Sequence, residues 1–129
     1  MARNMVDRAT LEEATEAVLH MSRALVGVAD FIDLKTPYLL GHARGVADLC
    51  AAAAMSLDMD RHTVVLLRRA GLVHGFGRLG VSNAIWEKPA ALGFGDWERV
   101  RLHPHFTERA FAQSPALAPI GILAGSHHE

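Results

Sequence analysis

Five histidines stand in or beside apolar, helix-patterned stretches of the chain, where an imidazole needs a specific reason to be. They are His42, His74, His103, His127 and His128. Neutral imidazole is the commonest protein ligand for divalent metal ions. A single histidine on an apolar face is usually a core residue with one hydrogen bond, but imidazoles from several helices converge only around a shared group. The pattern therefore favours a metal site.

Hydrophobic periodicity predicts that helices position these histidines. Apolar residues recur at steps of three and four over residues 11–32, 46–57, 64–74, 97–103 and 120–127. Alternation typical of strands does not extend beyond a few residues. We therefore expect an all-α single domain of about five to six helices around one core.

Local signals place the ends of the expected helices. Helix-start residues are Thr10 in a capping box, Asp58 or Asp60, Ser82 and Asp96. Pro104 lacks a backbone donor, so we expect it to kink or split the helix that carries His103. Three glycines within residues 75–80 should end the helix that carries His74.

The periodicity also predicts which side chains face the core. In the second helix the inward residues should be Val46, Leu49, Cys50, Ala53 and Leu57. Trp86 and Trp97 flank a loop next to the expected site, and we interpret both as packing residues. The remaining histidines, His20, His62 and His105, are expected on solvated surfaces.

Composition narrows the classes of protein to consider. The 129 residues are 50% hydrophobic, enough for one core, and the formal net charge is −1. This balance gives no reason to expect direct nucleic-acid binding or a membrane-surface partner. No apolar run approaches the roughly 20 residues that span a bilayer, and residues 1–8 lack a signal-peptide core. The single cysteine, Cys50, fits a reducing compartment, so we expect a cytoplasmic protein.

Taken in order, several short motifs resemble one known family. They are Gly41–Ala47, Leu72–Val81, Lys88-Pro89, Glu98–Pro104 and His127-His128-Glu129. Together they resemble the HD-GYP branch of the HD superfamily, over about residues 36–129, with residues 1–35 as an N-terminal lead-in helix. The resemblance implies an all-helical HD-type domain and, in active members, a metal-dependent phosphodiesterase that cleaves cyclic di-GMP.

The resemblance assigns a role to each motif residue. It implies that the five histidines named above are ligands of divalent transition metal ions of the Fe, Mn or Zn type. Arg78 stands where the family usually has a lysine thought to contact phosphate. Arginine keeps the positive charge and adds a bidentate fork, so phosphate contact remains chemically reasonable.

Three features depart from the family pattern. Gly75 follows His74 where the family has an aspartate that bridges two metals, and Tyr38 stands where some three-metal members have a glutamate. The Gly-Tyr-Pro segment does not occur within residues 1–129, so we expect a domain truncated before it. Two divalent ions about 3.5–4 Å apart need negative charge between them, which neutral imidazoles do not supply. We therefore expect doubtful or single-metal occupancy.

Two functional hypotheses follow. In the first, the chain is an HD-GYP-like phosphohydrolase, ancestrally a cyclic dinucleotide phosphodiesterase, whose activity is impaired by Gly75. In the second, it is a non-catalytic sensory, nucleotide-binding or dimerisation module of a bacterial signalling or transcription-regulatory protein. A cyclic dinucleotide or another phosphodiester is the expected ligand, and a homodimer is an open alternative to a monomer.

Overall fold

The structure is a computed structural model that describes the backbone of residues 2–128, with the side chains of residue 8 and residues 10–128. Within that range it contains helices, turns and loops, so the predicted all-α fold is confirmed. The α-helices are α1 Ala2–Asp33, α2 His42–Ser56, α3 Arg61–Val73, α4 Asn83–Trp86, α5 Phe94–Arg101, α6 His103–Phe111 and α7 Ala118–Gly125. The 3-10 helices are η1 Pro37–Leu39 and η2 Phe76–Gly80.

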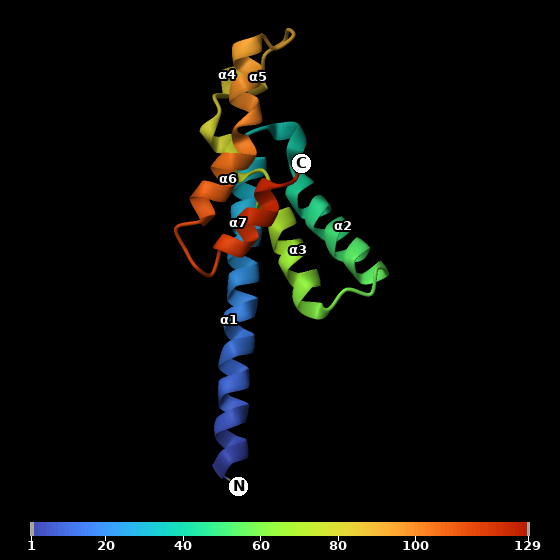
Figure 1. Ribbon diagram of the computed structural model, residues 1–129, viewed down its shortest axis with the longest axis vertical. Helices are drawn as coiled ribbons and strands as arrows, with labels where there is room; N and C mark the ends of the chain where they lie inside the picture. The colour runs from blue at the N-terminus through green and yellow to red at the C-terminus, as the bar shows by residue number, and fades with distance from the viewer. Residues whose placement is uncertain (1, 129) are drawn as a thin grey trace.

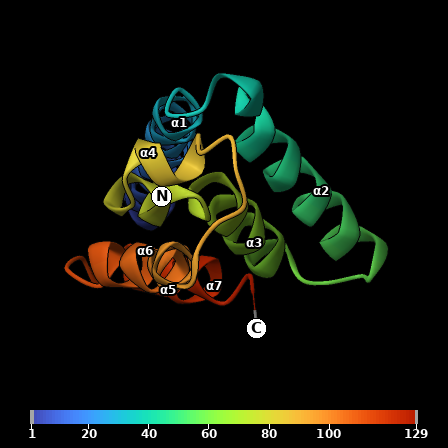
Figure 2. The same cartoon turned by 90° about the horizontal axis from the view of Figure 1, so that it is seen from above.

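Helix α3 lies at the centre of the body and contacts α1, α2 and α7. Viewed from above, α2 runs along one side of α3, and the pair α6 and α7 lies on the other side (Figure 2). Helix α6 also packs on η2, the segment that follows α3. This arrangement brings the end of α3, the start of α6 and the end of α7 to one region.

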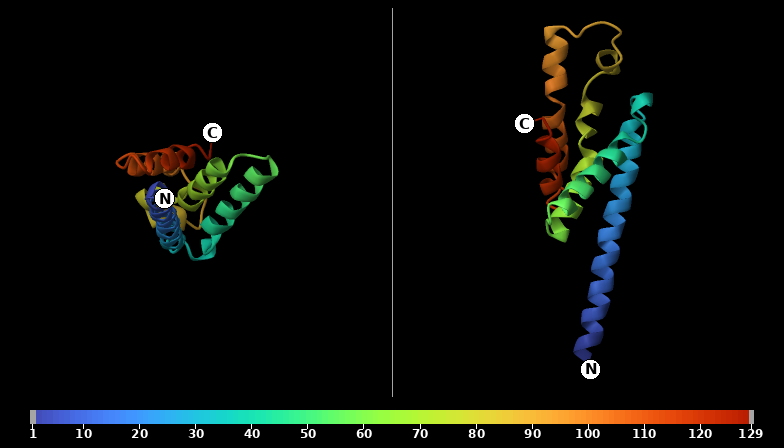
Figure 3. Two further views of the ribbon diagram at one scale, coloured as in Figure 1. Left: turned by 90° about the horizontal axis from the view of Figure 1, so that it is seen from below. Right: turned by 90° about the vertical axis from the view of Figure 1, so that its right-hand side faces the viewer.

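The N-terminal half of α1 projects beyond the body, as the blue ribbon shows in Figure 1 and in the right-hand view of Figure 3. Leu11 is 66% exposed, whereas Leu25, two heptads further along the same stripe, is 4% exposed. The predicted stripe over residues 11–32 therefore packs on the core only in its second half. Among the residues described, no helix is both long and apolar enough to span a membrane.

Some predicted helix boundaries are confirmed. The Asp60 carboxylate accepts a hydrogen bond from the Thr63 amide at 3.0 Å and caps α3. Ser82 caps the single turn of α4. The break at Pro104 is also confirmed, because α5 ends at Arg101 and α6 begins at His103.

Two predicted N-caps are wrong. Thr10 lies inside α1, which begins at Ala2, because the preceding residues include no glycine or proline and extending a helix costs far less than nucleating one. Asp96 lies at the third position of α5, not before it. Its carboxylate accepts a hydrogen bond from the Gly93 amide at 3.1 Å, so an acidic side chain still stabilises the helix start.

The buried face of α2 differs from the predicted one. Leu49 is 72% exposed and Leu57 is also exposed, whereas a stripe of small residues faces α3, namely Ala43, Ala47, Ala51 and Ala54. The reason is close backbone packing: a Cβ atom built on Gly71 of α3 would lie 2.7 Å from Ala47 Cα. Larger side chains cannot fit between helices at this separation, so the leucines turn outward.

The approach of α2 to α3 is directly testable. We expect Gly71→Ala to lower the free energy of unfolding by about 1–3 kcal/mol, because the added methyl group forces the two backbones apart. Gly45→Ala is the matched control, since a Cβ atom there meets nothing within 4 Å. Alanine at position 45 should leave stability unchanged or raise it by up to about 1 kcal/mol. Urea denaturation measures both, and equal stabilities of the two variants would contradict this packing.

Candidate metal centre

Three of the predicted ligands occupy the same kind of position, at or just beyond the end of a helix. His74 Nδ1 donates a hydrogen bond to Gly71 O at 2.7 Å, and His127 Nδ1 donates to Ala124 O at 2.7 Å. His103 Nδ1 donates to Val100 O at 2.6 Å. Each acceptor lies in the last turn of its helix, where carbonyl groups have no intrahelical partner. One local rule therefore orients three imidazoles from three different helices.

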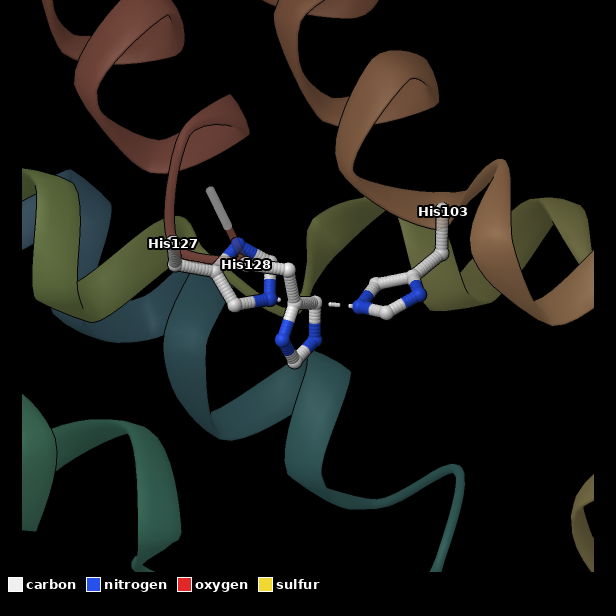
Figure 4. Close-up of side chains that lie close together, drawn as sticks. All are labelled: His103, His127 and His128. Carbon is white, nitrogen blue, oxygen red and sulfur yellow. Dashed lines mark hydrogen bonds between the residues drawn. The ribbon is translucent and has the colours of Figure 1, made fainter.

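This rule also fixes the tautomer of each neutral ring. A carbonyl oxygen can only accept, so Nδ1 carries the hydrogen and Nε2 presents a lone pair. His103 Nε2 and His127 Nε2 face each other at 3.2 Å, and His128 lies beside them (Figure 4). Two lone pairs at this distance repel unless a proton or a cation lies between them. One ring nitrogen from each of the three histidines lies within 4.8 Å of the others, a spacing that suits one metal ion.

All five predicted histidines form one continuous row of rings. The ring centroids of His42 and His74 are 5.3 Å apart, and those of His74 and His127 are 5.2 Å apart. His103 follows His127 at 5.2 Å, and His128 lies 4.1 Å from His127 and 5.2 Å from His103. The structure thus brings the residues together, while their role as metal ligands remains a prediction.

The rings border two cavities, whereas the sequence suggested a single shared one. A cavity of about 330 Å³ is lined by His42, His74 and His127 together with apolar residues of α2, α3 and α7. A second cavity of about 560 Å³ is lined by His103 and His128. His127 lies at the junction, because α7 ends between the two.

The surroundings favour the neutral form of the central imidazoles. Desolvation lowers the pKa of His74 and of His103, and nearby positive charge, including that of Arg78, lowers both further. For His127, desolvation and then the neighbouring His128, His74 and His103 lower the pKa from 6.5 to about 4. Neutral imidazole is the form that coordinates metal ions, so these ligands are ready to bind at neutral pH.

Arg78 is held beside the histidines by three contacts. Its guanidinium carbon lies 4.5 Å from the centroid of the Trp86 ring, a cation–π arrangement, and its Nη2 donates to Thr36 Oγ1 at 3.3 Å. The Trp86 indole donates to Arg78 O at 3.2 Å and its ring lies 5.7 Å from that of His103. Within the described residues Arg78 forms no ion pair, so its charge is open to an anion. Burial lowers its pKa, whereas Tyr38 and Asp33 raise it.

Two residues that help to position the site, Asp33 and Thr107, were not predicted from the sequence. Asp33 is 4% exposed, its carboxylate accepts from the Ala43 amide at 3.1 Å, and its negative charge raises the pKa of His74 and of Arg78. The available signal was its place in the last turn of a helix, where an acidic side chain opposes the helix dipole. Thr107 is fully buried, and its hydroxyl accepts from the Gly77 amide at 2.8 Å. No sequence pattern marked it.

The space available for a side chain differs between Gly77 and Gly75. A Cβ atom on Gly77 would lie 1.7 Å from His103 O, so glycine is required for η2 to approach α6. A Cβ atom on Gly75 would lie 3.3 Å from Ile32 Cγ2 and 3.6 Å from Arg78 Cδ. Position 75 therefore accepts a side chain after a shift of a few tenths of an ångström, and that side chain would begin beside Arg78.

The depressed pKa of His127 predicts how stability depends on pH. As pH falls, the unfolded chain binds a proton at His127 near pH 6.5, whereas the folded chain does so only near pH 4. The free energy of unfolding should therefore decrease as pH drops from about 6.5 towards 4. In chelator, His127→Asn should make this decrease shallower, because the amide keeps a donor for Ala124 O but does not titrate. His20→Asn, on an exposed part of α1, is the control and should keep the wild-type slope. Equal slopes for all three proteins would contradict this assignment.

Comparison with known proteins gives the chain a set of relatives. It is 41% identical over 101 residues to the 3'3'-cGAMP-specific phosphodiesterase 3 of Vibrio cholerae, covering 76% of this chain and 21% of that protein. The 3'3'-cGAMP-specific phosphodiesterase 1 of the same organism is 28% identical over 109 residues, which cover 84% of this chain and 25% of that protein. A cyclic di-GMP phosphodiesterase of Pseudomonas aeruginosa is 28% identical over 120 residues, 92% of this chain and 28% of that protein.

No family model matches the sequence, and no solved structure matches it either. The relatives are named for one reaction class, the hydrolysis of cyclic dinucleotides. The chain spans about a fifth to just over a quarter of the length of these relatives. It is therefore homologous to one segment of cyclic dinucleotide phosphodiesterases.

Proposed function

We propose that the chain is an HD-GYP-type phosphodiesterase domain that binds a divalent transition metal ion and a cyclic dinucleotide. The observation that carries the proposal is the pair of Nε2 lone pairs, on His103 and His127, that face each other at 3.2 Å. Such an arrangement is stable when a cation joins them. Metal-binding histidines commonly donate their other ring hydrogen to a backbone carbonyl, as these two do.

The donor set fits a transition metal of the Fe, Mn or Zn type. One metal ion is held by His103, His127 and His128. The neighbouring rings of His42 and His74 extend the site towards a position for a second metal ion. A divalent ion held in this way acidifies water and polarises a phosphoryl oxygen. Arg78 contributes a fixed positive charge, which Trp86 orients and which receives a phosphate oxygen of the substrate.

The same geometry predicts weak occupancy of a second position. Among the described residues the compact ligand group contains histidines and no carboxylate, and position 75 is glycine. Two ions close together then repel each other with no negative charge between them. We infer that one ion is held well, that the second is held poorly, and that turnover of cyclic dinucleotides is slow.

A non-catalytic module is the second candidate, and the projecting half of α1 favours it. Leu11 and Val18 lie one heptad apart on that half, and both are exposed. Exposed apolar residues at this spacing are typical of helices that pair with another helix. In this alternative, residues 1–35 serve as a lead-in for dimerisation, and residues 36–129 bind a nucleotide without cleaving it.

Metal content tests the first proposal. Purified without chelator, the chain should contain about one transition metal ion, and His103→Ala and His127→Ala should each lose most of it, because both nitrogens contact the same ion. His62→Ala, on the exposed start of α3, is the control and should keep wild-type content. Elemental analysis measures all four proteins. A metal-free wild type that also fails to bind added Zn²⁺ or Mn²⁺ would refute the proposal.

The rate of phosphodiester hydrolysis tests whether the missing carboxylate at position 75 limits metal binding and catalysis. Gly75→Asp should raise metal content towards two ions, because the carboxylate supplies the missing negative charge. Hydrolysis of bis(p-nitrophenyl) phosphate should be slow in the unmodified chain and should rise with the second ion in Gly75→Asp. Gly75→Asn, of matched size but neutral, controls for the shift of Ile32 and should gain neither. Rapid turnover by the unmodified chain, abolished by His74→Ala, would show that the glycine does not impair catalysis.

A further inference from the structure

One face of α1 is an exposed apolar ridge on the projecting half of the helix and the floor of an apolar groove on the other half. The ridge consists of Leu11, Ala14 and Val18, all exposed, with Leu11 at 66% and Val18 at 49%. One heptad after Val18 the same face reaches Leu25, which is buried at the groove. The groove has a volume of about 340 Å³, and the apolar residues that line it include Met21, Ala24 and Val28 of α1, Phe76 of η2, Phe111 of α6, and Leu117.

A ridge and a groove that lie end to end on one helix are complementary between two copies of the chain. In a dimer with two-fold symmetry, the same contact is made twice, once in each direction. An antiparallel pair of α1 helices, with the axis between Leu19 and His20, places Val18 opposite Met21 of the second copy. One heptad further out, Leu11 lies opposite Val28 of the second copy, at the groove. Each ridge therefore fills the groove of the other copy.

The position of the body along α1 favours this antiparallel arrangement over a parallel one. The body lies beside the C-terminal half of α1, and the N-terminal half extends beyond it (Figures 1 and 3). A parallel pair would bring both bodies to the same level and would place groove against groove, which leaves both grooves unfilled. An antiparallel pair places the bodies at opposite ends, so each body faces only the slender projecting half of the other copy.

The charges that flank the ridge favour the same orientation. Glu12, Glu13 and Glu16 are exposed beside the ridge, and Arg23 is exposed beside the groove. None of the four takes part in the ion pairs found among the described residues. A parallel pair would place the three glutamates next to their own copies, where like charges repel. In the antiparallel pair Glu16 lies at the level of Arg23 of the second copy, so the electrostatic term selects this orientation.

We propose that the chain forms an antiparallel homodimer in which the ridge of each α1 lies in the groove of the second copy. The interface consists of α1 and the residues of η2, α6 and the following segment that line the groove. It includes none of the five histidines. The proposal therefore does not depend on metal binding or catalysis, and it gives the projecting half of α1 a defined partner.

Sedimentation velocity of the full chain over a range of concentrations tests the dimer. Leu11→Glu and Val18→Glu should each weaken it about 10-fold or more, because each removes a buried apolar side chain and places a charge in the interface. Leu49→Glu is the matched control, since Leu49 is 72% exposed on α2, away from the ridge, and it should keep wild-type affinity. Glutamate is a good helix former, and circular dichroism establishes that each variant keeps its fold.

Cysteine cross-linking with a short bismaleimide tests the orientation, in a Cys50→Ser background that removes the single native thiol. A mixture of Leu11→Cys and Val28→Cys proteins should cross-link to each other, because these positions face each other across the antiparallel interface. Leu11→Cys alone should not cross-link, whereas in a parallel pair it would.

The outcomes separate this proposal from the proposed function. A chain that stays monomeric, a dimer that Val18→Glu leaves intact, or cross-linking of Leu11→Cys alone would overturn the antiparallel dimer, even if the chain binds metal and cleaves phosphodiesters. A dimer that depends on Leu11 and Val18, in a chain that binds no metal, would support this proposal and overturn the proposed metal centre.

Discussion

The hydrogen bond from an imidazole Nδ1 to a carbonyl at a helix end is the interaction on which the candidate site depends. It occurs at His74, His103 and His127, and in each case the acceptor lies in the last turn of its helix, where carbonyls lack the usual partner four residues ahead. The bond satisfies the carbonyl, fixes the tautomer and aims Nε2 away from the helix. Because α3, α6 and α7 meet at these points, the same bonds bring several Nε2 lone pairs close together. A cation can coordinate these lone pairs.

Close backbone packing determines where those helix ends meet. Gly71 lets α2 lie against α3, and Gly77 lets η2 approach the first turn of α6. The hydroxyl of Thr107 then joins the two segments, since it accepts from the Gly77 amide and lies 3.2 Å from His103 O and 3.4 Å from His74 O. Small residues thus bring two predicted ligands, His74 and His103, close together, although none of these small residues is itself a histidine or a carboxylate.

The distribution of charge around the row of rings is asymmetric. Arg78 has no ion-pair partner among the described residues, and the negative charge of the buried Asp33 carboxylate offsets part of its positive charge. The relatives are phosphodiesterases named for cyclic dinucleotides, whose substrates carry two phosphate groups. A cationic side chain and neutral imidazoles on one surface are suited to an anionic ligand, whether or not the chain cleaves it.

The order of residues along the chain was enough to predict the helical class, the caps at Asp60 and Ser82, the break at Pro104 and which five histidines lie together. These depend on local periodicity, on capping chemistry and on residue types that can bind metal, all of which can be read along the chain. The packing of the helices, in contrast, determined that α2 buries alanines while Leu49 faces solvent, and that half of the stripe on α1 stays outside the core. It also decided that Asp33 and Thr107 adjoin the site, and that Trp97 lines a cavity where the sequence suggested a packing residue. These outcomes depend on the separation and rotation of helices that are distant in sequence, which the pattern within one helix cannot specify.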